Sequence, residues 1–233
     1  MDATVIFDLD GTLAELGRPC TPENVALLHR LEERGARLVL SSGKPVYYLC
    51  GFVRQLGLCD PILIGENGGV LQAGVALPPP VFRKASLPEK TREGLRLLKA
   101  KMDEEFPDRF WYQPNETALT PFLYHTEDFP RLREMLKRTI TPEMELAVYE
   151  HSDCFDIAYA ALSKGYGIRH LAEVTGLDPK DMISVGDWTN DYSMFRETGY
   201  SVGIHLPDPT QATVNFPDLN TALKHILERI EEK

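Results

Sequence analysis

Short apolar runs alternate with helical segments at both ends of the chain, and this alternation restricts the fold more than any other feature. In the N-terminal part, buried strands are expected at 3–8, 36–43 and 61–65, with helices at 22–34 and 45–56 between them. Strands separated by helices form parallel sheets that helices cover on both faces. The N-terminal part of the sequence therefore predicts an α/β fold.

The middle of the chain breaks this alternation. The segment "ALPPPVF" at 76–82 is proline-rich, and it is not expected to continue a regular element. The elements expected after it are helices at 88–105 and 128–138 and strand-like runs at 109–113, 119–124, 144–149 and 154–159. Paired strands without helical crossovers indicate an antiparallel α+β module.

The alternation resumes near residue 162. Helices are expected at 164–175, 190–198 and 218–231, and strands at 181–186 and 200–204. The whole pattern predicts a Rossmann-like parallel-sheet core formed by 1–77 and 161–233, with a small α+β domain inserted at 78–160.

Composition excludes several classes of function. The chain of 233 residues has 25 basic and 35 acidic side chains and a net charge of -10, which argues against binding to nucleic acid. It has no apolar run long enough to span a membrane and no signal-peptide pattern at its start, so a cytoplasmic location is expected. Its four cysteines form no CxxC pair, so neither a zinc site nor a disulfide framework is expected.

Two carboxylates end the first strand, in "VIFDLDGTL" at 5–13. In a strand, Asp8 and Asp10 would face the same side, roughly 6–7 Å apart, at the edge where open α/β sheets bind ligands. An ordinary turn is the alternative, because Asp-Gly pairs are common in turns. A calcium loop of the EF-hand type is excluded, since Pro19 occupies the twelfth position, where a glutamate is needed.

A second acidic group follows another apolar strand, in "VGDWTNDYSMF". Asp187 ends the strand, and Asn190 and Asp191 start the next helix. A helical turn would bring Asp187 and Asp191 together, because they are four residues apart. Helix N-capping is the alternative, but a cap needs only one such side chain.

Two further elements indicate anion binding. Ser42 and Gly43 follow a strand, where a hydroxyl and backbone N–H groups can hold an anion. Lys164 lies in the first turn of a helix, where its charge opposes the helix dipole, and such local conflicts occur at functional sites. The alternatives are an ordinary strand-to-helix turn and a solvated surface lysine.

Together these four elements resemble the motifs of the haloacid dehalogenase-like phosphatase superfamily, in the same order along the chain. The matching stretches are DxDGT at 8–12, Ser42 before Gly43, Lys164, and GDxxND at 186–191. "ENGG" at 66–69 and the position of the insert resemble the type IIB cap branch. That branch includes Cof-like sugar-phosphate phosphatases, sucrose-phosphate phosphatases and archaeal-type phosphoglycolate phosphatases. The resemblance implies a Mg²⁺-dependent hydrolase of a small phosphomonoester, of the sugar phosphate or phosphoglycolate class.

The resemblance also implies roles for the acidic residues. Mg²⁺ would be bound by the Asp8 carboxylate, the Asp10 backbone carbonyl and Asp187, with Asp191 either binding through water or orienting the other groups. Asp8 would attack phosphorus and form an aspartyl-phosphate. Asp10 would protonate the leaving group and then deprotonate the hydrolytic water.

The remaining contacts implied by the resemblance concern the phosphoryl group. The residues implied to hold the phosphoryl oxygens are Leu9 through its N–H, Ser42, Gly43, Lys164 and Asn190.

Arg109 and Tyr112, in the insert, are candidate substrate contacts, with ordinary surface or core packing as the alternative.

Two other functions stay open, a phosphomannomutase-like phosphosugar mutase and a non-catalytic phosphate-binding module. The sequence departs from common family forms at Lys44, where arginine is usual, and at Trp188, where small residues are usual.

Overall fold

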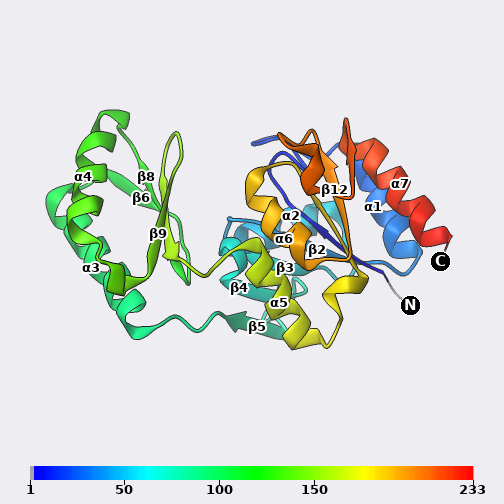
Figure 1. The fold of residues 1–233 in the computed structure, drawn as a ribbon, viewed down its shortest axis with the longest axis horizontal. Helices are drawn as coiled ribbons and strands as arrows, with labels where there is room; N and C mark the ends of the chain where they lie inside the picture. The colour runs from blue at the N-terminus through cyan, green and yellow to red at the C-terminus, as the bar shows by residue number, and fades with distance from the viewer. Residues whose placement is uncertain (1–2, 233) are drawn as a thin grey trace. The chain divides into compact units, whose positions relative to one another are not determined.

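The computed structural model describes residues 3–232, so residues 1, 2 and 233 of the predicted core domain lie outside the described part. The chain forms two compact units, one made of Met1–Arg83 with Ser163–Lys233 and the other of Lys84–Leu162 (Figure 1). We describe each unit separately and call them the core unit and the inserted unit.

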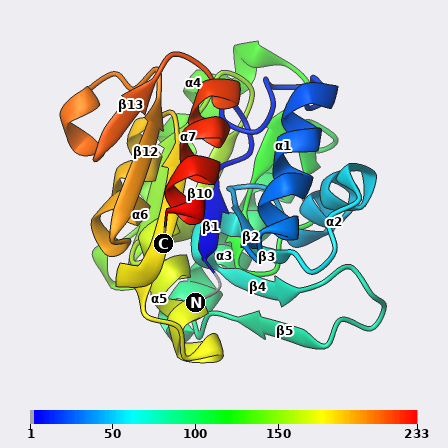
Figure 2. The same cartoon turned by 90° about the vertical axis from the view of Figure 1, so that its right-hand side faces the viewer.

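An eight-stranded sheet forms the centre of the core unit (Figure 2). In spatial order its strands are β13 (Val214–Phe216), β12 (Tyr200–Ile204), β11 (Met182–Gly186), β1 (Thr4–Phe7), β2 (Arg37–Ser41), β3 (Ile62–Gly65), β4 (Val70–Ala73) and β5 (Val81–Lys84). The six strands from β13 to β3 pair in parallel, and β4 pairs antiparallel with β3. The predicted α/β fold with a mainly parallel sheet is therefore confirmed.

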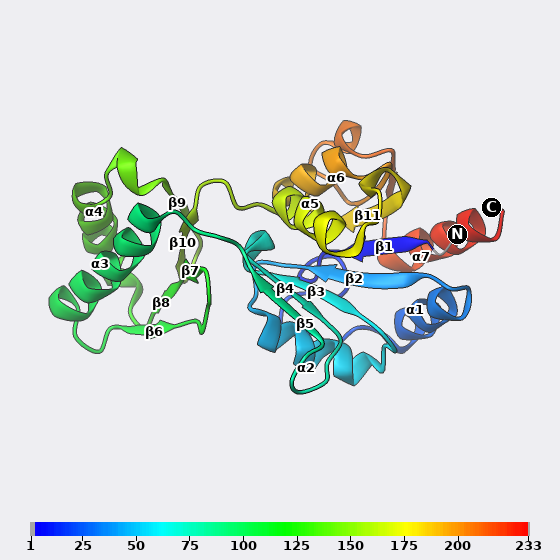
Figure 3. The same ribbon diagram turned by 90° about the horizontal axis from the view of Figure 1, so that it is seen from below.

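Helices cover both faces of this sheet (Figure 3). They are α1 (Pro22–Glu33), α2 (Val46–Leu56) and α7 (Leu219–Glu231) on one face, and α5 (Lys164–Thr175) and α6 (Tyr192–Glu197) on the other. Each face has its own apolar cluster, and alternate residues of β1 point to the two faces. Val5 and Phe7 pack in the cluster with α1, α2 and α7, and Ile6 packs in the cluster with α5 and α6. This division follows because successive side chains of a strand point to opposite faces of the sheet.

Local sequence signals account for several element ends. The Thr21 hydroxyl accepts a hydrogen bond from Asn24 N and caps α1, and Ser163 caps α5 in the same way through Tyr166 N. The helix predicted at 190–198 is instead the 3₁₀ turn η5 (Thr189–Asp191) followed by the short helix α6.

The proline-rich segment 76–82 interrupts the regular elements as expected, and a new strand begins at its end. Strand β5 begins at Val81, directly after the prolines, and lies at the edge of the sheet. Proline lacks an N–H and is tolerated at or just before an edge strand, where fewer ladder hydrogen bonds are needed.

The inserted unit is an α+β module with its own apolar cluster. One antiparallel sheet has the order β7 (Ala118–Leu119), β10 (Phe155–Tyr159) and β9 (Leu146–Glu150), and a second pairs β6 (Phe110–Tyr112) with β8 (Pro121–Leu123). Helices α3 (Glu89–Glu105) and α4 (Phe129–Thr139) pack on this cluster. Among the described residues, the structure has no helix that is long and apolar enough to cross a membrane.

Candidate active site

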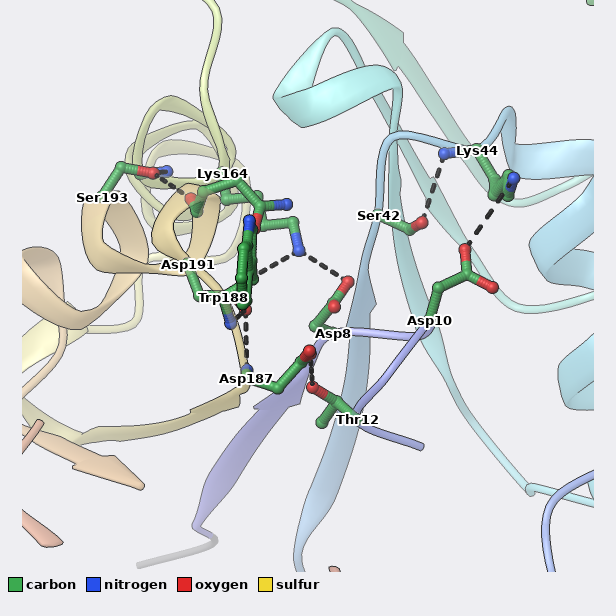
Figure 4. Close-up of polar contacts among 12 residues, drawn as sticks. Asp8, Asp10, Thr12, Ser42, Lys44, Lys164, Asp187, Trp188, Asp191 and Ser193 are labelled. Atoms are coloured by element: carbon green, nitrogen blue, oxygen red, sulfur yellow. Dashed lines mark hydrogen bonds and ion pairs between the residues drawn. The ribbon is translucent and has the colours of Figure 1, made fainter. Parts of the chain in front are cut away.

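Three neighbouring strands deliver the polar residues of the site to one edge of the core sheet (Figure 4). Strand β1 lies between β11 and β2 and runs parallel to both. Asp8 follows β1, Ser42 follows β2, and Asp187 follows β11. Carboxyl ends of parallel strands share one edge, so residues that are distant in sequence come together there.

A buried ion network links Asp8, Lys164 and Asp191. Lys164 Nζ lies 2.5 Å from Asp8 Oδ1 and 2.6 Å from Asp191 Oδ1, and the lysine residue is only 2% exposed. Burial alone lowers the pKa of Lys164, but the two adjacent carboxylates outweigh it and leave its pKa raised. These carboxylates explain why a lysine is placed in the first turn of α5 despite the helix dipole.

The site has more negative than positive charge. Burial raises the pKa of Asp8 to about 7, with Lys164 opposing the shift and Asp191 and Asp187 adding to it. Burial also raises the pKa of Asp187. One carboxylate oxygen of each of Asp8, Asp187 and Asp191 lies within 4.8 Å of the others. Oxygen ligands with this excess of negative charge fit a hard divalent cation such as Mg²⁺.

Both carboxylate oxygens of Asp191 have interaction partners within the protein. Its Oδ1 faces Lys164, and its Oδ2 accepts hydrogen bonds from the backbone N of Asp187 at 2.9 Å and of Trp188 at 3.1 Å. These bonds include the capping contacts expected at a helix start, and they also fix the turn that holds Asp187. The geometry favours the orienting role for Asp191 over direct metal binding.

Thr12 and Gly11 position the Asp187 carboxylate. Thr12 Oγ1 donates a 2.6 Å hydrogen bond to Asp187 Oδ1. Gly11 has a φ of +90°, and a Cβ atom there would lie 2.3 Å from Asp187 Oδ2. The glycine therefore serves both the left-handed turn and the close approach of Asp187.

The Asp10 side chain has a different partner from Asp8. Strand β1 ends at Phe7, so the chain is already turning at these two residues. Asp10 Oδ2 lies 3.9 Å from Lys44 Nζ, and Figure 4 shows this carboxylate directed toward Lys44. Both residues thus follow the strand, and their carboxylates face different lysines, Lys164 and Lys44.

Ser42 and Gly43 form a tight loop supported by the ENGG segment. Ser42 Oγ accepts a hydrogen bond from Lys44 N at 3.2 Å, and Ser42 O accepts one from Asn67 N at 3.0 Å. A Cβ at Gly43 would lie 3.3 Å from Asn67 Nδ2, which places the Asn67 amide beside this loop. Asn67 and Thr12 lie within the matched motifs, and neither is among the site residues predicted from the sequence.

Leu9 and Asn190 lie on the two loops that flank Asp8 and Asp187. The Leu9 side chain is buried, and its carbonyl accepts a hydrogen bond from Ala14 N. Asn190 is exposed in the turn η5, where its carbonyl accepts a hydrogen bond from Ser193 Oγ. Trp188, in the same stretch, is 58% exposed.

Arg109 and Tyr112 belong to the inserted unit and have partners within it. Arg109 Nη1 lies 3.6 Å from Asp128 Oδ2. The Tyr112 hydroxyl donates a 2.8 Å hydrogen bond to Asp103, and burial together with this carboxylate raises the pKa of Tyr112. Their role as substrate contacts stays a prediction.

Comparison with known protein families gives a match over most of the chain. A family model described as haloacid dehalogenase-like hydrolase matches residues 5–76 and 88–207. A phosphoglycolate phosphatase of Methanococcoides burtonii is 26% identical over 207 residues, which are 88% of this chain and 84% of the relative. A phosphoglycolate phosphatase of Methanoculleus marisnigri is 28% identical, over 86% of this chain and 83% of the relative.

Solved structures share the fold at low sequence identity. A haloacid dehalogenase-like hydrolase from Bacteroides thetaiotaomicron superposes with a TM-score of 0.77 at 18% identity, covering 97% of this chain and 100% of its own. A sugar phosphatase of subclass IIB gives a TM-score of 0.69 at 17% identity, covering 96% and 98% of the two chains. These matches extend over both units.

Proposed function

Given that the chain belongs to the haloacid dehalogenase-like hydrolase family, we propose that it hydrolyses phosphomonoesters with Mg²⁺ through an aspartyl-phosphate on Asp8. Membership confirms the resemblance that the four motifs indicate, and with it the assignment as a phosphatase of this superfamily. The observation that most supports the mechanism is the cluster of buried Asp8 and Asp191 with half-buried Asp187 beside Lys164.

The cluster fits a bound Mg²⁺ on chemical grounds. Asp8 and Asp187 would supply carboxylate oxygens and Asp10 its backbone carbonyl, while Asp191 orients Asp187 through the backbone. When bound, Mg²⁺ would neutralise negative charge on the phosphoryl group and on the carboxylates around it.

Side chains and backbone N–H groups of the protein supply the nucleophile and the contacts to the phosphoryl group. Asp8 is the nucleophile, and Lys164 Nζ at 2.5 Å orients its oxygen and favours its ionised form against the effect of burial. The Ser42 hydroxyl, the N–H groups of Leu9 and Gly43, Lys164 and Asn190 hold the phosphoryl oxygens.

Asp10 protonates the leaving oxygen and afterwards removes a proton from the attacking water. Its partly exposed carboxylate near Lys44 is free to turn toward the leaving group, since no short hydrogen bond to Lys44 holds it.

The substrate class follows from the named relatives and is part of the proposal. Phosphoglycolate phosphatases and a sugar phosphatase are among the similar proteins. We propose a small phosphorylated metabolite of one of these two classes. Arg109 and Tyr112 of the inserted unit are the proposed substrate contacts.

The test is phosphate release from a panel of phosphomonoesters by the wild-type protein and by Asp8→Asn. We expect release that needs Mg²⁺ and stops with EDTA, and a loss of about 10⁴-fold or more in Asp8→Asn. Asp60→Asn is a matched control, because Asp60 is exposed and precedes β3 at the other end of the sheet. Full turnover in a folded Asp8→Asn protein would contradict the mechanism. Isomerised sugar phosphate in place of free phosphate would point to the mutase.

A further inference from the structure

A second group of metal-ligand side chains lies in the inserted unit, outside the cluster around Asp8. His151 and Cys154 lie in the connection between β9 and β10, and Asp156 lies in β10. A ring nitrogen of His151, the Cys154 sulfur and a carboxylate oxygen of Asp156 all lie within 4.8 Å of one another. The group combines nitrogen, sulfur and oxygen donors, whereas the cluster around Asp8 offers oxygens only.

The separation of the His151 and Asp156 ligand atoms suits two ligands of a tetrahedral ion. His151 Nε2 lies 3.1 Å from Asp156 Oδ2. Zinc bonds of about 2.0–2.1 Å to nitrogen and oxygen place two such ligands roughly 3.3 Å apart at the tetrahedral angle. An ion could therefore replace the His151–Asp156 hydrogen bond with a movement of a few tenths of an ångström.

Hydrogen bonds behind Asp156 fix the orientation of its carboxylate. The Thr120 hydroxyl donates to Asp156 Oδ1 at 2.7 Å, and Asn115 Nδ2 donates to Thr120 Oγ1 at 2.8 Å. Gln113 Nε2 in turn donates to Asn115 Oδ1 at 2.9 Å. This chain of side chains leaves Oδ2 directed at His151, which is the arrangement that supports carboxylate ligands in metal sites.

The backbone around the cysteine is also held in place. His151 N donates to Cys154 O at 2.9 Å, and Leu123 N donates to Asp153 O at 2.9 Å. Cys154 forms an isolated bridge with Phe122 of β8. The thiol is buried while the His151 side chain is 50% exposed, so an ion could enter from the histidine side and keep a water as its fourth ligand.

We propose that His151, Cys154 and Asp156 bind a transition-metal ion of the zinc class, separately from Mg²⁺. A thiolate and an imidazole select such an ion over Mg²⁺, which prefers oxygen ligands. Binding releases the thiol proton of Cys154, and the two anionic ligands balance the charge of the divalent ion. The bound ion joins the β9–β10 connection to β10 and stabilises this part of the inserted unit. A CxxC pattern does not identify this group, because it has a single cysteine within His-x-x-Cys-x-Asp.

The experiment uses the full-length protein with saturating Mg²⁺, so that the cluster around Asp8 is already occupied. Zn²⁺ is titrated by calorimetry, and Co²⁺ is added as a spectroscopic probe of sulfur ligation. We expect one equivalent of Zn²⁺ to bind and a sulfur-to-cobalt charge-transfer band to appear. His151→Asn and Cys154→Ser should each weaken binding by about 100-fold or more, and Thr120→Val by about 10–100-fold.

Two controls separate this site from the other candidates. Cys59→Ser removes the exposed cysteine and should keep the cobalt band. Asp8→Asn should also keep it, which makes the result independent of the proposed phosphatase mechanism. Circular dichroism checks the fold of each variant, and His151→Asn changes only a half-exposed side chain if Cys154→Ser fails to fold. Absence of stoichiometric Zn²⁺ binding, or unchanged binding in folded His151→Asn, would overturn the proposal.

Discussion

Lys164 determines the electrostatic balance of the acidic site at the scale of single residues. Its ammonium group is the partner of both Asp8 and Asp191, and all three side chains are buried. A buried charge that loses its partner costs several kcal/mol, because its hydration in the unfolded state is not replaced.

We therefore expect Lys164→Met to reduce the free energy of unfolding by about 3–5 kcal/mol. The measurement is urea unfolding in slightly alkaline, metal-free buffer, where the carboxylates are most ionised. Lys224→Met is the control, because Lys224 is exposed on α7 and its loss should cost less than about 0.5 kcal/mol. Equal stabilities of the two variants would show that Lys164 does not compensate the buried carboxylates.

Protons and Mg²⁺ are expected to compete for the same carboxylates. Burial raises the pKa of Asp8 from 3.8 to about 7 in the metal-free protein, and the pKa of Asp187 is raised as well. Below pH 7 Asp8 holds a proton that Mg²⁺ must displace, and above it the carboxylate is already ionised. The affinity for Mg²⁺ should therefore fall about tenfold per pH unit below about pH 7 and level off above it.

Calorimetric titration of Mg²⁺ in two buffers of different protonation enthalpy measures this proton release directly. Below about pH 7 the apparent binding enthalpy should differ between the two buffers, and above about pH 7 the two values should become equal. An affinity that does not change across this range would mean that Asp8 is already ionised without the metal.

At the scale of elements, Gly167 shows how closely α5 approaches the sheet, and Gly51 in α2 is a helical glycine without close neighbours. A Cβ at Gly167 in α5 would lie 2.6 Å from Ile64 Cγ2 and 3.0 Å from Gly68 Cα. A Cβ at Gly51 in α2 would meet nothing within 4 Å. Both positions are helical, so only the packing around them differs.

We expect Gly167→Ala to destabilise the protein by about 1–3 kcal/mol despite the better helix propensity of alanine. Gly51→Ala should stabilise it by about 0.5–1 kcal/mol, because the propensity gain has no steric cost there. Thermal or urea unfolding measures both. Stabilisation by Gly167→Ala would show that α5 can move away from η1 (Glu66–Gly68) without loss.

The elements differ in how well the sequence predicts them. Helices such as α3 and α7 and buried strands such as β1 have enough apolar periodicity to be predicted from sequence alone. Strands β4 and β13 were missed, because each is three or four residues long and lies among glycines, prolines or polar residues. Such short strands are defined by pairing with a neighbour, and single-sequence patterns do not reveal pairing.

The sequence predicts which residues form the site better than it predicts how their side chains are arranged. Strand ends and motif order indicated Asp8, Asp187 and Lys164, and the structure brings these three together. The spacing of Asp187 and Asp191 did not reveal that Asp191 acts through backbone N–H groups, because that depends on the conformation of the turn.

At the scale of the whole molecule, we expect the inserted unit to fold by itself. Lys84–Leu162 has its own apolar cluster of ten buried side chains, drawn from both of its helices and from its strands. A polypeptide of residues 84–162 should therefore show native-like circular dichroism and a cooperative urea transition. Gradual, non-cooperative unfolding of this fragment would contradict the prediction.

Mg²⁺ provides a further readout in this experiment, because the cluster around Asp8 lies entirely in the core unit. The ion should leave the stability of the fragment unchanged. It should stabilise the full chain by about 2.7 kcal/mol at a concentration of 100 times its Kd.

The central position of β1 has a consequence for synthesis on the ribosome. Its neighbours are β2, made soon afterwards, and β11, which begins only at Met182 after the whole inserted unit has been translated. For most of translation one edge of this apolar strand has no native partner, and such edges promote aggregation. Early folding of the inserted unit cannot shorten this interval, so the nascent chain should depend on chaperones that shield its N-terminal strands until the C-terminal segment emerges.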